Sequence, residues 1–520
     1  MPNQQPINSH SVSAVQWALL VTLFLIALFL RTSQLGDYGF WTDEQYHAIA
    51  AQSMLEDGKP NFPNGNHYVR GLPFTALVAA SFELFGVSEW SGRLPSVVIS
   101  MIFLLLSFFL TRPFFGTTTA LLFFSFIALS PTIIEHSRMS RFYSLYQLSF
   151  FVGAWLFYKG FEYDWRKGTR QGFFVERFLA INIPLLFISS FLIIFACYFQ
   201  GLSILFGISL LIYCAACLFI SKNTLINKYI LTIIAATTFL TLLYLFAPAL
   251  FEFAQSLFTI LLPWAQYNDY PTSFYRWYLQ ENYLSIVLLS QVGFILLYRH
   301  DKKLAIYLNA LFLGALIVLS ILAMKQHRYM LHILPFMFLL AAYGLNGIIL
   351  LIHEKLAGSR SIKFATPAII LIFILSCNQC LVDAFKMPST WRFIDWKAFF
   401  NQELDIKPTD IIVATNQNSL FYYFRAPDYY LNSSYLTFPN PTETWVTDKV
   451  IISEEDLLSI LDTEKRIILL TSKSRFKDPF YITDELRRLI STRFTTTKNN
   501  QYPHILMMTS NPSNHQNASQ

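Results

Sequence analysis

Long runs of apolar residues, many of them close to the length of a membrane span, constrain this chain more than any other feature. A helix of roughly 20 apolar residues crosses the hydrocarbon core of a bilayer. The sequence holds about eleven runs near that length, without the single apolar stripe of a soluble helix. They lie at residues 14–30, 94–111, 117–131, 142–158, 178–198, 201–220, 229–250, 283–298, 304–323, 330–352 and 364–382. We therefore predict a polytopic α-helical membrane protein.

Composition supports this assignment and excludes other classes of protein. Hydrophobic residues make up 54% of the chain and charged residues only 13%, so it cannot be a solvated globule. The formal net charge of +6 is not gathered on a contiguous basic face, so no nucleic-acid partner is predicted. The first run has no basic stretch before it and no small-residue cleavage site after it, which favours an uncleaved helix over a secretory signal.

Charged residues between the runs predict the orientation of the chain. A shorter apolar stretch, 72–85, is left out of the count of spans, and the N-terminus is placed inside. Most short basic loops then fall on the cytoplasmic side, as the positive-inside rule requires. The stretch 72–85 becomes a helix along the interface, within a long first external loop at 31–93. Residues 1–385 form the predicted transmembrane domain.

Beyond residue 385 the composition becomes that of a soluble domain. Apolar strands are predicted at 410–415, 465–471 and 503–509, and helices at 454–461 and 483–493. Strands that alternate with helices indicate a small α/β domain with a partly parallel sheet. We assign it to residues 386–510, on the extracytoplasmic side, and expect the polar tail 511–520 to be disordered.

Two adjacent carboxylates, Asp43 and Glu44, follow the first predicted span. Charge beside a membrane segment is costly to place, so its presence indicates a functional site. The structural alternative is that Asp43 caps a helix over 45–55, because Asp is a favoured N-cap residue.

Two basic pairs lie on the same predicted face of the membrane as these carboxylates. They are Arg138 with Arg141, and Lys325 with Arg328. Snorkelling at the interface would explain either pair alone. Together with the carboxylates they make the arrangement that a lipid-linked phosphate requires, with cations for the phosphoryl oxygens and an acid beside the sugar carbon.

Two longer stretches carry a resemblance to a known group of enzymes. The run LGDYGFWTDEQYHAIA at 35–50 is followed by ELFGVSEWSGRLPS at 83–96. Ser130-Pro131, the run SRMSRFYS at 137–144 and Arg328-Tyr329 with Pro335 extend the match over residues 19–345. In these features the chain resembles the membrane glycosyltransferases of the GT-C fold, in particular the branch of protein O-mannosyltransferases and lipid A aminoarabinose transferases.

The resemblance implies an activity and roles for individual residues. It implies transfer from a polyprenyl-phosphate sugar donor to a lipid or protein acceptor, with Asp43 as the principal catalytic carboxylate and Glu44 beside it. External basic residues would bind the donor phosphate: Arg138, Arg141, Lys325 and Arg328, with Arg70 a weaker candidate. Asp43 would act as general base in an inverting displacement. We accordingly expect an integral protein of the bacterial inner (plasma) membrane, with its active site on the extracytoplasmic side.

Three points stay open at the level of sequence. Many relatives have a His at the corner where Tyr198-Phe199-Gln200 stands here, so a divalent metal ion is left open as a cofactor and no ligands are assigned. A lipid-linked glycan polymerase or ligase is the alternative enzyme, but the loop at 251–282 is poor in the cations it would need. A transporter is the alternative from another class, although transporters place ionisable residues at mid-membrane, often in repeated halves.

Overall fold

The computed structural model describes residues 13–162, 179–220, 227–246, 271–322, 325–355, 394–433, 446–447, 449–463, 465–497 and 501–510. The chain forms two compact units. We call the first the membrane unit, which comprises Met1–Thr32, Ser96–Arg138 and Phe142–Phe385. The second, the loop–sheet unit, comprises Ser33–Pro95, Met139–Arg141 and Lys386–Gln520.

The membrane unit is helical, as predicted. Six helical segments in the described ranges are long and apolar enough to cross a membrane: Ala14–Thr32, Glu89–Leu129, Gly201–Ile220, Phe274–His300, Lys302–Ile321 and Leu334–Ile352. The helices and short helical turns with residues in this unit are α1 (Ala14–Thr32), α4 (Glu89–Leu129), α5 (Pro131–Ser137), α6 (Tyr143–Phe161), α8 (Ile183–Phe199), η1 (Gly201–Ile204), α9 (Leu205–Ile220), α10 (Lys228–Phe246), α12 (Phe274–His300), α13 (Lys302–Asn309), η3 (Ala310–Gly314), α14 (Ala315–Ile321), η4 (His327–Met330) and α15 (Leu334–Lys355).

Two details refine the predicted spans. The runs 94–111 and 117–131 are two helical segments under the single label α4, and they meet at Gly116, whose backbone is not helical and whose φ of 79° glycine adopts without strain. The second segment ends at Leu129, and α5 begins at Pro131. The predicted span 364–382 lies outside the described residues. The total of about eleven spans therefore stays a prediction.

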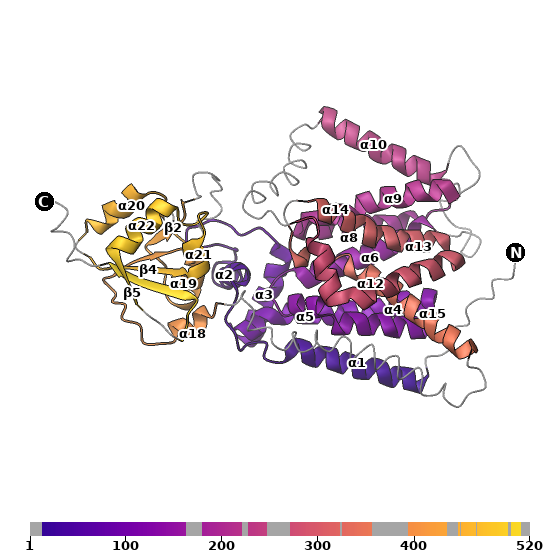
Figure 1. The fold of residues 1–520 in the computed structure, drawn as a ribbon, viewed down its shortest axis with the longest axis horizontal. Helices are drawn as coiled ribbons and strands as arrows, with labels where there is room; N and C mark the ends of the chain where they lie inside the picture. Colours follow the sequence, from indigo (N-terminus) through magenta and orange to yellow (C-terminus); the bar gives the residue numbers. More distant parts are fainter. Residues whose placement is uncertain are drawn as a thin grey trace. The chain divides into compact units, whose positions relative to one another are not determined.

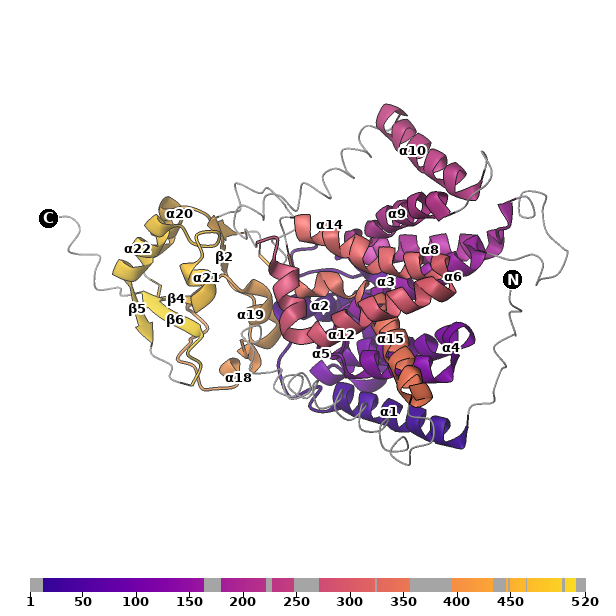
Figure 2. The ribbon, with the colours of Figure 1, turned by 45° about the vertical axis from the view of Figure 1, so that its right-hand side comes forward.

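Small residues allow the helices of the membrane unit to approach closely. A Cβ added at Gly293 of α12 would lie 1.8 Å from the carbonyl oxygen of Leu340 in α15, and one at Gly344 would lie 2.4 Å from that of Leu289. Only glycine permits such backbone contact, a common device where membrane helices pack. Figure 2 shows α12 beside α15 and α6 beside α8.

The first external loop of the prediction belongs to the loop–sheet unit. It contains α2 (Thr42–Asp57) and α3 (Leu72–Phe85), which pack on each other. Helix α3 begins and ends at the same residues as the apolar stretch 72–85, which was not counted as a predicted span. It is shorter than the six candidate spans.

The C-terminal part of this unit is an α/β domain, as predicted. Its six strands are β1 (Ile411–Ala414), β2 (Tyr429–Leu431), β3 (Val450–Ile451), β4 (Ile467–Ser472), β5 (Phe494–Thr497) and β6 (Ile505–Ser510). Strands β2, β4 and β5 are labelled in Figure 1. The six strands lie in the order β3-β2-β1-β4-β6-β5. The first four are parallel, whereas β6 is antiparallel to β4 and to β5.

Helices cover both faces of this sheet. Ile467 and Leu469 of β4 share one apolar cluster with α20 (Glu454–Leu461) and α22 (Asp484–Arg493). Ile468 and Leu470 point to the other face, which is covered by α18 (Trp396–Phe400) and α19 (Gln417–Tyr423). A short helix, α21 (Lys473–Lys477), follows β4. Burial of both faces explains why β4 is apolar along most of its length.

The predicted strands and helices of this domain are confirmed, but three of the six strands, β2, β3 and β5, were not predicted from the sequence. Strands β2 and β3 have only three and two residues, too few for a period-2 pattern to appear. Strand β5 reads Phe-Thr-Thr-Thr and lies at the edge of the sheet, so its sequence is mostly polar. The tail 511–520 lies outside the described residues.

Candidate active site

Helix α2 places both carboxylates of the acidic pair in its first turn. The helix begins at Thr42, three residues before the predicted start, with Trp41 at the N-cap. Glu44 performs the capping: its Oε2 accepts the Trp41 N–H at 2.8 Å. The alternative in which Asp43 is the N-cap is wrong, because Asp43 lies inside the helix. Negative charge in a first helical turn is favoured by the helix dipole.

Glu44 forms a buried, bidentate ion pair with Arg93. The Arg93 Nε and Nη2 donate to Oε1 and Oε2 of Glu44, both at 2.9 Å. The Ser140 N–H also donates to Glu44 Oε1 at 2.6 Å. Glu44 is fully buried and Arg93 is 4% exposed, so the pair is closed to solvent. Glu44 therefore joins α2, α4 and the segment that carries Arg141.

Arg93 also fixes the turn that leads into α2. Its guanidinium donates to the carbonyl oxygens of Leu35, Tyr38 and Gly39 at 2.8–2.9 Å. The sequence interpretation gave Arg93 no role, although it lies in the RLPS run that carries the resemblance. A buried guanidinium with five N–H donors can hold a carboxylate and several carbonyls at once.

Asp43, unlike its neighbour, reaches solvent and lies beside Arg141. The Asp43 side chain is 29% exposed, and its Oδ2 is 3.7 Å from Nη2 of Arg141. Nη1 of Arg141 donates to the Asp43 carbonyl at 2.9 Å and to the Tyr68 hydroxyl at 3.3 Å. The Arg141 side chain is only 4% exposed. The structure thus places an accessible carboxylate beside a buried cation, whereas the catalytic and phosphate-binding roles expected for them from the sequence stay predictions.

The other predicted cations are divided between the two units. Arg70 is exposed in the loop–sheet unit, and its charge acts on His47 and Tyr68. The other three belong to the membrane unit. There Arg138 donates a hydrogen bond to the Leu30 carbonyl at 3.1 Å. Lys325 donates to the Leu322 carbonyl at 2.6 Å. The guanidinium carbon of Arg328 lies 5.8 Å from the centroid of the Tyr329 ring. Their gathering around Asp43 stays a prediction.

The described histidines and acids near the site do not form a metal centre. Across the described ranges, no three His, Cys, Asp or Glu side chains are grouped so that they could hold a metal ion. Glu44 is occupied by Arg93, and Nδ1 of His47 lies 2.8 Å from the Thr75 hydroxyl. The described residues near Asp43 therefore do not fit a divalent ion.

His47 is buried under α3, close to positively charged side chains. Burial lowers its pKa well below the ordinary value, and the charges of Arg141 and Arg70 lower it further. The folded protein therefore keeps His47 neutral at a pH where the unfolded chain binds a proton, so stability is complete above about pH 6.5 and falls as the pH decreases below it.

This linkage predicts a pH dependence of folding. Below pH 6.5 the free energy of unfolding should fall by up to about 1.4 kcal/mol per pH unit through His47 alone. Denaturant unfolding of the detergent-solubilised protein at pH 7 and pH 5 measures this slope. The variant His47→Asn should show a shallower slope, because Asn does not titrate. Equal slopes for both proteins would refute the assignment.

Solved structures of two membrane proteins match nearly the whole chain. ArnT from Cupriavidus metallidurans, bound to undecaprenyl phosphate, aligns with a TM-score of 0.57 over 96% of this chain and 98% of ArnT. AglB, the oligosaccharyltransferase from Archaeoglobus fulgidus in complex with an inhibitory peptide and a dolichol-phosphate, aligns with a TM-score of 0.60 over 88% of this chain and 69% of AglB. The chain has the GT-C fold.

The GT-C fold confirms the resemblance that the sequence motifs carried, and with the six apolar helices it makes this an integral membrane protein. The identities to ArnT and AglB are 13% and 12%, so the likeness concerns the fold. YycA of Bacillus subtilis (strain 168), described as a candidate mannosyltransferase, is 27% identical over 146 residues, which are 26% of this chain and 21% of YycA. No protein-family model matches the chain.

Proposed function

We propose that this protein is a membrane glycosyltransferase that transfers a sugar from a polyprenyl-phosphate donor to an extracytoplasmic lipid or protein acceptor. The observation that carries the proposal is the pair of Asp43 and Arg141, an accessible carboxylate beside a buried guanidinium on a GT-C fold. A transferase that releases a lipid phosphate needs one group to accept a proton and another to bind the departing oxyanion.

Asp43 acts as the general base in this reaction. It takes the proton of the acceptor hydroxyl while the acceptor oxygen forms a bond to the anomeric carbon. The bond from that carbon to the phosphate oxygen breaks on the opposite side, so the configuration inverts and the lipid phosphate leaves as an anion. An acceptor that is itself a phosphate needs no base, and Asp43 then positions it.

Arg141 binds the phosphate that leaves. Its burial strengthens the interaction with an anion, since charge is weakly screened away from water. Arg138, Lys325 and Arg328 are further candidates for the same phosphate, and Arg70, which is exposed, is a weaker one. Glu44 holds the site together through Arg93 and takes no part in proton transfer, because it is buried and already paired.

The donor class is supported by the lipids in the matched structures. ArnT was solved with undecaprenyl phosphate and AglB with a dolichol-phosphate, both polyprenyl monophosphates. A lipid of that class would place its phosphate at the membrane surface and its chain among apolar helices.

Binding of the donor lipid tests this assignment. Arg141→Gln should weaken binding of undecaprenyl phosphate roughly ten- to a hundredfold, because a charge-assisted contact contributes about 1.5–3 kcal/mol. Titration of the lipid against the purified protein, followed by intrinsic fluorescence, gives the dissociation constant. Arg488→Gln is the matched control, since Arg488 is exposed on α22. If both variants bind as tightly as the wild type, Arg141 does not bind the phosphate.

We further propose that the protein lies in a bacterial inner membrane and that its loop–sheet unit is outside the cytoplasm. The basic residues Arg299, Lys302 and Lys303 surround the turn at Asp301, which the positive-inside rule assigns to the cytoplasm. A reporter fused after Asp301 should be cytoplasmic, and one fused after Ser510 should be external. Both reporters on the same side would overturn the orientation.

A further inference from the structure

Helix α19 of the α/β domain contacts the segment that enters α2, within the loop–sheet unit. The Ser419 hydroxyl donates to Oε1 of Gln45 at 3.0 Å, and Nε2 of Gln45 donates to the Phe40 carbonyl at 2.9 Å. Ser419 and Gln45 are both fully buried, so neither hydrogen bond competes with water. A buried polar pair of this kind is costly to break, which fixes the geometry between the two segments.

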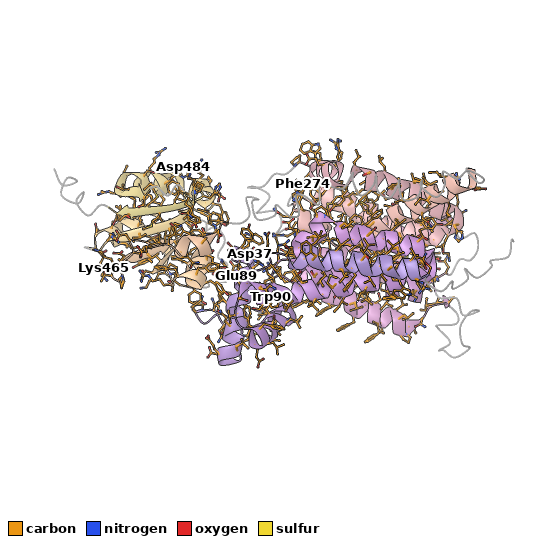
Figure 3. All side chains as sticks on the ribbon, turned by 90° about the horizontal axis from the view of Figure 1, so that it is seen from below. Asp37, Glu89, Trp90, Phe274, Lys465 and Asp484 are labelled. Carbon is orange, nitrogen blue, oxygen red and sulfur yellow. The ribbon has the colours of Figure 1, made fainter. Side chains whose placement is uncertain are left out.

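The backbone N–H of the same residue, Phe40, is held by Tyr423. The Phe40 N–H donates to the Tyr423 hydroxyl, which in turn donates to Oε1 of Glu89 at 3.1 Å. Nζ of Lys397 in α18 donates to Oε2 of Glu89 at 2.8 Å, which anchors this carboxylate. Glu89 and Trp90, labelled in Figure 3, begin α4. Phe40 lies three residues before Asp43. Its backbone N–H and its backbone carbonyl are thus both hydrogen-bonded to side chains that α18 and α19 hold in place.

Apolar contacts reinforce these hydrogen bonds. The Phe40 ring meets Tyr422 edge-on, with centroids 5.5 Å apart. Phe421 and Tyr422 also pack on the apolar cluster under α2 that contains Ile49 and Tyr68. At Gly39 a Cβ would lie 3.0 Å from Cβ of Lys397 and 3.1 Å from the Tyr423 hydroxyl, so the entering segment lies closely against α18 and α19.

We propose that the C-terminal α/β domain is a positioning element for the catalytic carboxylate, acting through Ser419 and Tyr423. The inference rests on the proposed function, since it presupposes that Asp43 acts on the acceptor. Asp43 lies in the first turn of α2, so the direction of its side chain follows the backbone from Phe40 to Gln45. A displacement of about 1 Å at a reacting group can cost about a hundredfold in rate. A domain that contributes no reacting group can therefore set the turnover.

The test measures the kinetics of transfer from a polyprenyl-phosphate sugar by the full-length protein in lipid vesicles. Tyr423→Phe and Ser419→Ala should each lower kcat about tenfold or more. The KM for the donor should stay unchanged, because the proposed phosphate contact at Arg141 is retained. The losses in kcat of Gln45→Leu and Ser419→Ala should not multiply in the double variant, since both remove the same hydrogen bond.

Matched controls separate positioning from a general weakening of the domain. Ser453→Ala removes the hydroxyl that caps α20 and so destabilises the same domain without contacting α2. Tyr481→Phe removes one phenol hydroxyl elsewhere in the domain. Both controls should keep the wild-type kcat, even where Ser453→Ala lowers the melting temperature.

Two outcomes would overturn the inference, and they are distinguishable. If Tyr423→Phe and Ser419→Ala keep the kcat of the controls while Asp43→Asn is inactive, the α/β domain does not position the base. If Asp43→Asn itself remains active, Asp43 is not the base of the proposed reaction, and the positioning role fails with it.

Discussion

Asp43→Asn should lower the rate of sugar transfer about a hundred- to ten-thousandfold, the usual loss when general-base assistance is removed. The substitution keeps the size and shape of the side chain but removes its charge and its ability to accept a proton. The fold should be unaffected, because Glu44 caps α2 and the hydrogen bond from Arg141 to the Asp43 backbone carbonyl is retained. Initial rates with a polyprenyl-phosphate sugar, together with a melting curve, measure both quantities.

Asp37→Asn is the matched control for this prediction. Asp37, labelled in Figure 3, is exposed in the same first loop and undergoes the same chemical change. At equal protein levels, Asp37→Asn should keep the wild-type turnover, whereas Asp43→Asn should lose nearly all of it. Near-normal turnover of Asp43→Asn would assign Asp43 a structural role at the start of α2.

Arg93→Met should destabilise the loop–sheet unit by about 3–5 kcal/mol, because it leaves the buried Glu44 carboxylate without its cation. The change also removes the donors for the Leu35, Tyr38 and Gly39 carbonyls. Denaturant unfolding of the purified protein, monitored by the fluorescence of its tryptophans, gives the free energy.

Two further variants sharpen this prediction. Arg93→Met combined with Glu44→Gln should be more stable than Arg93→Met alone, since no buried charge then remains unpaired. Arg488→Met, at an exposed position, should change the free energy of unfolding by less than about 0.5 kcal/mol. A loss for Arg93→Met as small as that of Arg488→Met would contradict a structural role of the ion pair.

The sequence predicted features that depend on neighbouring residues. The helical spans, the limits of α3 and the buried strands β1, β4 and β6 follow from local apolar patterns. The resemblance named Asp43 as the principal carboxylate of the adjacent pair, but local patterns could not divide the pair into an exposed and a buried member. That division depends on Arg93, which is 49 residues from Glu44 in the chain.

Local sequence patterns do not predict contacts between residues that are far apart in the chain. Ser419 and Gln45 are 374 residues apart, and no periodicity or capping signal links them. The burial of His47 depends likewise on α3, which comes from a later part of the loop. The predicted outer face indicated the candidate residues, whereas the burial of each candidate depends on contacts that only the folded chain makes.

The most direct measurement is the identity of the lipid product released by the purified protein in vesicles that contain a polyprenyl-phosphate sugar and an envelope extract as acceptor. Mass spectrometry of the wild-type reaction should detect polyprenyl monophosphate and the glycosylated acceptor, and NMR of that acceptor should show the inverted configuration at its new glycosidic bond. Neither product should form with Asp43→Asn. Release of a polyprenyl diphosphate from a diphosphate-linked donor, with no turnover of the monophosphate donor, would contradict the account.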